Sequence, residues 1–361
     1  MWCGAKLRID FGMRYCCLLL LILAAREPLV ADIINVPGDH ATIQAAVDAA
    51  NDGDEILVAA GTFQETIFPG TKSFILRGSV DAAGAPTTFI ISSNDSAIRI
   101  SGNDSADLLF ENLRLRGPSN WSLSRGGGFY CRDSRPTLRN CVFDECTALN
   151  GSYNYGGGAF ALCHFSDLTP VFIDCTFSNC EAKYGGGFYF YVHTSSDFVA
   201  SVSMTGCRFE SNFAEDGGGA IYMYGQAGVH LANCFFGSNS SEGDASQLEN
   251  ARWCTTTIRD TVFCAGTGGL WQIDGAYRDL GGVCVTDDCT DADEDGVPDS
   301  CAFSASCNAD ANGDHAVNGA DLGLLIASWG DSSPCPVDIN LDGQVDGADL
   351  GLLIAAWGAC Q

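Results

Sequence analysis

The sequence has few basic residues for its length. Its 361 residues include 18 Lys and Arg against 45 Asp and Glu, which gives a formal charge of -27. Because a nucleic-acid surface needs clustered Lys and Arg, this deficit argues against a nucleic acid as a partner. Residues 279–361 contain 16 acidic side chains and no Lys or Arg at all. A segment of this kind either stays extended by self-repulsion or captures cations.

Long apolar runs are also missing, except for one near the N-terminus. Residues 15–25 follow Lys6, Arg8 and Arg14, are too few to span a bilayer, and precede small residues. We expect residues 1–31 to be a secretory signal peptide and the mature chain to be secreted, with no membrane span. Cleavage would remove three of the 19 cysteines and leave 16, an even number that suits an oxidising compartment.

What the sequence does contain is internal repetition. A glycine triplet followed by an apolar stretch begins at Gly126, Gly156, Gly185 and Gly217. A second motif lies between these stretches, continues as Phe-x-x-Cys or Phe-x-x-Asn, and contains Cys141, Cys175, Cys207 and Cys234. Two interleaved motifs with one period, separated by Gly and Asn turns, predict a β-solenoid in which each coil pairs with its neighbours.

The same pattern extends upstream. Strands are expected at residues 55–58, 73–77, 87–92 and 108–115. One helix is expected over residues 42–50, where Ile43, Ala46, Val47 and Ala50 share a face. Because the open end of a solenoid exposes unpaired strand edges, we interpret this helix as a cap over that end.

Two resemblances follow from these motifs. Thr42-Ile43-Gln44 through Gly53-Asp54-Glu55 to Gly61-Thr62-Phe63 resembles the opening of right-handed parallel β-helix proteins of the pectin lyase type. The glycine-triplet and Phe-x-x-Asn repeats resemble those of chlamydial polymorphic outer membrane proteins. Together they cover residues 32–278 and imply an all-β, right-handed parallel β-helix. The activity stays open, because this solenoid carries lyases, hydrolases, esterases and adhesins.

The acidic tail contains a duplicated loop and helix. Oxygen-bearing side chains recur at loop positions 1, 3, 5, 9 and 12, the spacing that wraps a hard cation. The expected calcium ligands are Asp310, Asn312, Asp314, Asn318, Asp321, Asp338, Asn340, Asp342, Asp346 and Asp349. Each loop is followed by GADLGLLIA, and the apolar residues of each helix are expected to form one face, namely Leu322, Leu325, Ile326 and Trp329 or Leu350, Leu353, Ile354 and Trp357.

The two loop-helix units resemble a type I dockerin over residues 307–361. This resemblance implies a small α-helical calcium-binding domain and a cohesin-like or other cell-surface protein as its partner. The linker before it, residues 279–306, resembles a thrombospondin type 3 calcium repeat. The ligands that this implies are Asp291, Asp293, Asp295 and Asp299. A solvated acidic linker is the alternative.

The repeated cysteines invite a metal interpretation, but no His pairs accompany them at zinc spacing. We expect Cys141, Cys175, Cys207 and Cys234 to form one column and Cys146 and Cys180 another, either as small packed residues or as disulfides. The residues that precede the first set include Asp174, and Asp260 holds the same place one repeat later. They are expected to form a turn ladder rather than to act as catalytic acids.

Six arginines fall within residues 114–139. We predict that Arg132, Arg135 and Arg139 bind an acidic polysaccharide, with an arginine as a lyase base. The alternative is a set of solvated arginines that balance nearby acids.

Aromatic residues form a second candidate. If Tyr130, Phe160 and Tyr189 point inward with Ile221, then Phe190, Tyr222 and Tyr224 point outward. Such a strip either stacks on sugar rings or packs across strands under a loop.

The sequence thus predicts a secreted, calcium-binding modular protein that is attached through a dockerin and takes part in polysaccharide binding or surface adhesion. A polysaccharide-degrading enzyme, either a lyase or a glycoside hydrolase, is the alternative. The lack of a recognisable catalytic signature favours binding, whereas a dockerin favours an enzyme, so enzymatic activity stays open.

Overall fold

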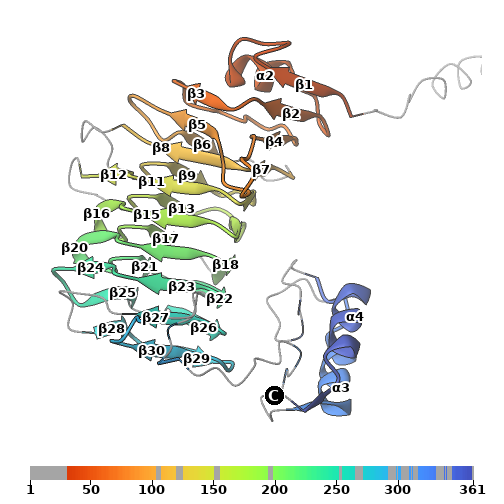
Figure 1. Cartoon of the computed structure of the whole chain (residues 1–361), viewed down its shortest axis with the longest axis vertical. Helices are drawn as coiled ribbons and strands as arrows, with labels where there is room; N and C mark the ends of the chain where they lie inside the picture. The colour runs from red at the N-terminus through yellow and green to blue at the C-terminus, as the bar shows by residue number, and fades with distance from the viewer. Residues whose placement is uncertain are drawn as a thin grey trace, which may run out of the picture.

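The computed structural model of the chain is an all-β solenoid followed by a small helical unit (Figure 1). It describes residues 31–102, 107–118, 125–149, 155–193, 198–251, 254–264, 271–291, 298, 300–301, 309, 311, 316–330, 337, 339 and 344–359. The predicted signal peptide lies outside these residues, apart from Ala31. In the described residues no helix is long and apolar enough to cross a membrane.

Three long parallel sheets and one short one form the solenoid. Sheet A contains β1 (Ile33–Val36), β2 (Glu55–Val58), β4 (Ile75–Arg77), β7 (Leu109–Glu111), β10 (Thr137–Arg139), β14 (Val171–Ile173), β18 (Ala200–Thr205), β22 (Ala227–Ala232), β26 (Thr255–Arg259) and β29 (Arg278–Asp279). Sheet B contains β3 (Gly61–Phe63), β5 (Thr88–Ile91), β8 (Leu113–Arg116), β11 (Val142–Asp144), β15 (Thr176–Ser178), β19 (Arg208–Glu210), β23 (Phe235–Gly237), β27 (Val262–Cys264) and β30 (Cys284–Thr286).

Sheet C contains β6 (Ile98–Ser101), β9 (Phe129–Arg132), β13 (Ala159–Cys163), β17 (Phe188–Val192), β21 (Ile221–Tyr224), β25 (Ala245–Asn250) and β28 (Trp271–Asp274). The short sheet D contains β12 (Thr147–Ala148), β16 (Glu181–Tyr184), β20 (Phe213–Gly217) and β24 (Ser240–Ser241). Each coil contributes a strand to successive sheets, so residues that are one coil apart become in-register neighbours. The last strand, β30, lies beyond residue 278, where the solenoid was expected to end.

A left-handed turn separates sheet A from sheet B in successive coils. Asn112, Asn140, Asp174, Gly206, Asn233, Asp260 and Gly282 occupy this turn, with φ between 47° and 67°. The turn ladder expected at Asp174 and Asp260 is therefore present, and these acids serve the backbone conformation. The expectation of one strand over residues 108–115 was wrong, because Asn112, with φ of 59°, divides it into β7 and β8.

The core of the solenoid is built from stacked identical side chains. Phe143, Phe177, Phe209, Phe236 and Phe263 form one fully buried column, whose ring centroids lie 4.4 to 4.8 Å apart. Cys141, Cys175, Cys207 and Cys234 form another and remain free thiols, each of which donates to a carbonyl of the preceding coil. Of the two expectations for these cysteines, packing as small residues holds and disulfide bonding does not.

A buried asparagine ladder runs beside the phenylalanines. The Asn212 side chain accepts from the Cys180 amide at 3.0 Å and donates to the carbonyl of Phe177 at 2.9 Å. Asn239 repeats both contacts one coil later, on the amide of Asn212 and the carbonyl of Phe209. Since these backbone groups are buried, the ladder removes a desolvation cost that each coil would otherwise carry.

A helix covers the N-terminal end of the stack, as expected (Figure 1). This helix, α2 (Ile43–Ala49), is capped by the Thr42 hydroxyl and packs against β1 and β2 through Ile43, Ala46 and Val47.

The C-terminal unit contains α3 (Gly319–Ala327), α4 (Gly347–Ala355) and a two-stranded antiparallel pair, β31 (Ala316–Val317) and β32 (Gly358–Ala359). The buried residues of its core are Ala309, Val317, Leu325, Val337, Val345 and Leu353.

Candidate functional site

The outer face of sheet C carries a column of aromatic side chains. Along β9, Phe129 and Cys131 belong to the solenoid core, whereas Tyr130 belongs to a separate cluster outside it. The equivalent positions of the next coils extend this aromatic column, which consists of Tyr130, Phe160, Tyr189 and Tyr222. Successive ring centroids lie 5.5, 5.6 and 5.2 Å apart, with interplanar angles of 20° or less.

The structure corrects the predicted orientation of these aromatics. Tyr130, Phe160 and Tyr189 point outward rather than inward, and Phe190 lies in the core with no exposed surface. The error came from the glycine triplet of the fourth repeat. Gly218, not Gly217, has the positive φ that marks the first glycine of the other triplets. Shifting the alignment by one residue makes Tyr222, rather than Ile221, the partner of Tyr189.

Because its rings stack on one another, this column does not offer a binding surface for sugars. Its four side chains are 5%, 0%, 4% and 9% exposed, and Tyr155, Tyr184 and Tyr191 pack against them. The ring faces are turned toward each other along the stack, so they are not available to a sugar ring. Of the two interpretations of the aromatics, cross-strand packing therefore holds.

The two ends of the aromatic column are charged. At the N-terminal end, the guanidinium of Arg99 lies 4.0 Å from the centre of the Tyr130 ring. At the other end, Glu249 is in register with Tyr222, and Asp274 is in register with Glu249. The outer face of sheet C thus changes from cationic through aromatic to anionic along the solenoid.

Glu249 is the most unusual carboxyl group of this face. Its side chain is only 8% exposed, and Oε2 has no hydrogen-bond partner within the part of the chain that the structure describes. The carboxyl group fills a space left by Gly217, because a Cβ added to that glycine would lie 1.9 Å from Oε2. Burial first, and then repulsion from Asp244, Asp274 and Asp216, raise the pKa of Glu249 to about 8.

Asp216 lies beside Glu249, but its pKa is shifted in the opposite direction. Burial works against its charge, but hydrogen bonds from Tyr184 and Lys183 still lower the pKa of Asp216, and the Lys183 ammonium is 3.1 Å away. A protonated carboxyl group next to carboxylates is the arrangement used for general acid and base roles. Sequence reasoning missed this cluster, because the coil of Glu249 lacks the glycine triplet that aligned the other coils.

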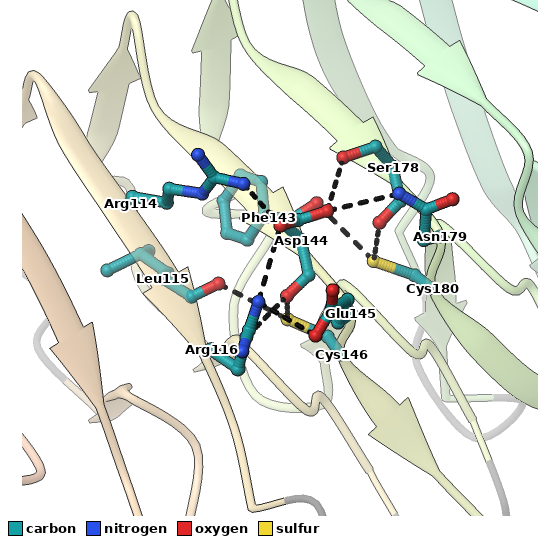
Figure 2. Close-up of polar contacts among 10 residues, drawn as sticks. All are labelled: Arg114, Leu115, Arg116, Phe143, Asp144, Glu145, Cys146, Ser178, Asn179 and Cys180. Carbon is teal, nitrogen blue, oxygen red and sulfur yellow. Dashed lines mark hydrogen bonds and ion pairs between the residues drawn. The ribbon is translucent and has the colours of Figure 1, made fainter. Parts of the chain in front are cut away.

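The predicted arginine cluster is divided between different sheets. On the outer face of sheet B, Arg114 and Arg116 both bind the carboxylate of Asp144, and Arg116 also lies 2.8 Å from Glu145 (Figure 2). Ser178 and Asn179 donate to the other oxygen of Asp144. Burial opposes the charge of Asp144, but the hydrogen bonds from Arg114, Asn179 and Ser178 lower its pKa. Both oxygens of the Asp144 carboxylate therefore have hydrogen-bond partners, which is typical of a structural network.

The three arginines predicted to bind substrate lie on two different sheets and in the turn between them. Arg132 is on the outer face of sheet C, 3.9 Å from Asp133. Arg139 is on sheet A, 3.6 Å from Glu111, and Arg135 is in the turn between the two sheets. Arg132 and Arg139 thus each have a separate carboxylate partner.

A known protein family has the same architecture. The family described as right-handed β-helix region matches residues 87–263. The fold of the described residues from β1 to β30 is a parallel β-helix. Two solved structures of the pectin methylesterase from Aspergillus niger are similar, each 13% identical and covering 74% of this chain and 88% of the other. Their TM-scores are 0.37 for the penultimately deglycosylated form and 0.32 for the deglycosylated form. No curated protein matches the chain.

Beyond the β-helix, four of the predicted dockerin-type calcium ligands lie in the described residues. Asn318 and Asp346 cap α3 and α4, and Asp321 and Asp349 complete a capping box in each helix. Asp310, Asn312, Asp314, Asp338, Asn340 and Asp342 lie outside the described residues. Among the residues that are described, no set of three or more His, Cys, Asp or Glu side chains is arranged to hold a metal ion.

Two of these four residues are buried carboxylates. Asp321 and Asp349 are both 0% exposed, and one oxygen of each accepts the backbone N–H of its capping residue at 2.8 Å. Carboxylate oxygens held at the end of an acidic loop are the donors that calcium prefers.

The apolar residues of the two helices are divided between core and surface, which corrects the expected single face. Leu325 and Leu353 are fully buried, but Ile326 and Trp329 are 60% and 50% exposed. Their counterparts Ile354 and Trp357 are 59% and 51% exposed, and Leu324 and Leu352 are 43% and 44% exposed. We call these two sets, Leu324, Ile326 and Trp329 with Leu352, Ile354 and Trp357, the duplicated surface.

Two disulfides join the linker to the last two coils of the β-helix. Cys264 pairs with Cys289, and Cys284 pairs with Cys301. The segment that resembles a thrombospondin repeat is thus linked at both ends. Of its predicted calcium ligands only Asp291 is in the described residues, and Asp293, Asp295 and Asp299 lie outside them.

Proposed function

We propose that the protein is a secreted polysaccharide-associated protein whose C-terminal unit binds calcium and attaches the chain to a cohesin-like or other surface protein. The observation that supports attachment most strongly is the duplicated surface. Two sets of a leucine, an isoleucine and a tryptophan are exposed to nearly the same extent, residue by residue. Apolar side chains that are not needed in the core of so small a unit are typical of a binding surface.

The duplication implies two equivalent docking faces for one partner. Calorimetry of the full calcium-loaded chain against a panel of purified cohesin modules tests this. Ile326→Asp and Ile354→Asp should each leave affinity within a few-fold of the original, and the double variant should lose binding. Val80→Asp, which changes an apolar side chain of the β-helix that is 44% exposed, is the matched control.

Loss of all binding from one single variant that stays folded and calcium-loaded would leave one dedicated face. Failure of the unchanged chain to bind any cohesin module would contradict attachment by this route. Because calcium holds the two loops in this proposal, a chelator should abolish binding in all variants.

Glycoside hydrolysis is a second candidate, and Glu249 is the observation that favours it. A buried carboxyl group that keeps its proton near neutral pH can protonate a leaving oxygen, while a neighbouring carboxylate such as Asp274 or Asp216 acts on the sugar or on water. Incubation with neutral and acidic glycans, followed by assays for new reducing ends and for unsaturated uronate, tests this and the lyase alternative together.

The expected result is a hydrolytic activity that Glu249→Gln lowers by a factor of about 10² to 10⁴, the usual contribution of a general acid. Glu242→Gln is the control, since Glu242 is exposed in the same coil. Absence of product from every glycan, or full activity in Glu249→Gln, would leave binding as the role of the β-helix.

A further inference from the structure

A polar cleft lies near the N-terminal end of the β-helix, apart from the aromatic column. Its volume is about 430 Å³, within the usual range for small-ligand sites. Two segments line it, one after β3 and one between β5 and β6. The lining residues are Gln64, Glu65, Thr66 and Phe68 from the first segment and Ser92, Ser93, Asn94 and Asp95 from the second.

Phe68 is an exposed aromatic side chain on a fixed backbone. It is 48% exposed. The Gln44 amide in α2 holds both polar groups of the Phe68 backbone, since its Oε1 accepts from Phe68 N at 2.8 Å and its Nε2 donates to Phe68 O at 3.2 Å. Asp48 fixes Gln44 in turn, at 2.8 Å. A ring that is exposed on a backbone held in this way is available to a ligand at little cost in conformational entropy.

The charged groups of the cleft are already engaged. Glu65 accepts the backbone N–H groups of Ile43 and Gln44 at the start of α2. Asp95 pairs with Arg99 at 3.1 Å, and Arg99 also lies over Tyr130. The hydroxyls of Thr66 and Ser92 bind each other at 2.6 Å.

The open groups are neutral amides. Gln64 and Asn94 are exposed, and within the described residues their side-chain amides have no hydrogen-bond partner. Each amide offers both a donor and an acceptor. An aromatic ring with amide donors and acceptors around it suits a sugar, whose ring faces carry C–H groups and whose rim carries hydroxyls.

The charges of the cleft decide which kind of sugar fits. Its lining contains two carboxylates, from Glu65 and Asp95, and no Lys or Arg. Within the described residues, the one cation that the cleft's carboxylates contact, Arg99, is already paired with Asp95. A uronate would therefore meet the Glu65 carboxylate without a free cation in the lining, whereas a neutral sugar meets no such repulsion. This differs from the acidic polysaccharide that the arginines suggested.

We propose that this cleft is a binding subsite for a neutral sugar residue of a polysaccharide, with the Phe68 ring as its stacking surface and Gln64 and Asn94 as its hydrogen-bonding groups. The inference rests on the polysaccharide-related function proposed above and deepens it, because it names the sugar class and the place where it binds.

Calorimetry and saturation-transfer NMR on the full chain, with neutral gluco-, xylo- and manno-oligosaccharides and with an oligogalacturonate as probes, test the subsite. The unchanged chain should bind at least one neutral oligosaccharide more tightly than the oligogalacturonate. Phe68→Ala should weaken that binding about tenfold, which corresponds to losing roughly half of the burial energy of a phenylalanine. Phe68→Trp should retain it, and Asn94→Ala should weaken it.

Phe165→Ala is the matched control, because Phe165 is 77% exposed and does not line the cleft. Its binding should equal that of the unchanged chain. Unchanged binding in Phe68→Ala and Asn94→Ala would overturn the subsite while leaving polysaccharide binding in place. Preference for the oligogalacturonate would overturn the sugar class. If the unchanged chain bound no glycan at all, both the subsite and the polysaccharide function would fall.

Discussion

In the β-helix, Phe177 has a stacked phenylalanine on the coil before it and another on the coil after it, whereas in the C-terminal unit the buried Leu325 has a single counterpart, Leu353. The β-helix extends one continuous core through most of its coils, whereas the core of the C-terminal unit has six buried apolar residues among those that are described. The difference shows two ways to stabilise a chain. Repetition lets each coil support the next, while the small duplicated unit has capped helices and, in our proposal, a bound cation.

The largest expected effect is loss of fold in the C-terminal unit alone. Asp321→Ala with Asp349→Ala removes two buried carboxylates, and with them both capping boxes and two of the calcium ligands that we propose. Circular dichroism of the full chain should lose the signal of α3 and α4 while the β signal stays. A chelator should have the same effect on the unchanged chain.

Glu242→Ala, an exposed acid of the β-helix, is the control and should change nothing. If the helical signals were identical with calcium and with chelator, the fold of the C-terminal unit would not depend on calcium, and this difference from the β-helix would be contradicted.

The next effect concerns a single layer of the phenylalanine column. Phe177→Ala opens a cavity between Phe143 and Phe209 and should lower the free energy of unfolding by about 3 to 5 kcal/mol. Urea unfolding measures this, with the exposed Phe165→Ala as a control expected to stay within about 0.5 kcal/mol. Equal effects of the two substitutions would mean that the stacked column does not carry the stability of the β-helix.

A smaller effect is expected from the asparagine ladder. Asn212→Ala leaves the buried amide of Cys180 and the carbonyl of Phe177 without their partners, which should cost about 1 to 3 kcal/mol in urea unfolding. Asn94→Ala removes an exposed amide and should cost less than about 0.5 kcal/mol. A cost for Asn212→Ala as small as that for Asn94→Ala would indicate that neighbouring coils replace the lost bonds.

The smallest effect is a change in how stability depends on pH. The pKa of Glu249 is raised from 4.5 to about 8 in the folded chain. Between pH 4.5 and about 8, the folded chain therefore keeps a proton on Glu249 that the unfolded chain has already released. The free energy of unfolding should therefore fall as pH rises from 4.5 to about 8 and then level off. Glu249→Gln should lack this part of the slope, as thermal unfolding at several pH values would show. An identical slope in both chains would contradict the raised pKa.

The columns of the β-helix could be predicted because they are local in sequence. The turn residue, the cysteine and the phenylalanine recur within four positions of one another, from Asn140 to Phe143 and again from Asp174 to Phe177. One period therefore aligns coils whose side chains must stack. The helix over 42–50 was equally predictable, from its apolar face and its Thr42 cap.

The outer face of sheet C was not predictable in this way. The fourth repeat has an extra glycine, Gly217, so aligning this repeat on its glycine triplet placed its strand one residue out of register. A shift of one residue exchanges the inward-facing and outward-facing side chains of a strand. Glu249 occupies the aromatic position of a coil without the triplet, so its place in the column depends on pairing between β21 and β25. In the C-terminal unit, helical periodicity put Trp329 on the same face as Leu325, but two short helices bury only part of that face.

The disulfides of the last two coils affect how the β-helix responds to force. Where the C-terminal unit holds the chain to a surface, any pull enters the β-helix from the side of Cys301. The bridges shorten the path of the load, since they close loops with sequence separations of 17 and 25 residues and carry force covalently to Cys284 in β30 and Cys264 in β27. Unravelling cannot begin by peeling β30 away alone. An attached chain should resist shear at the end where its anchor lies, while the far end under α2 has no such reinforcement among the described residues.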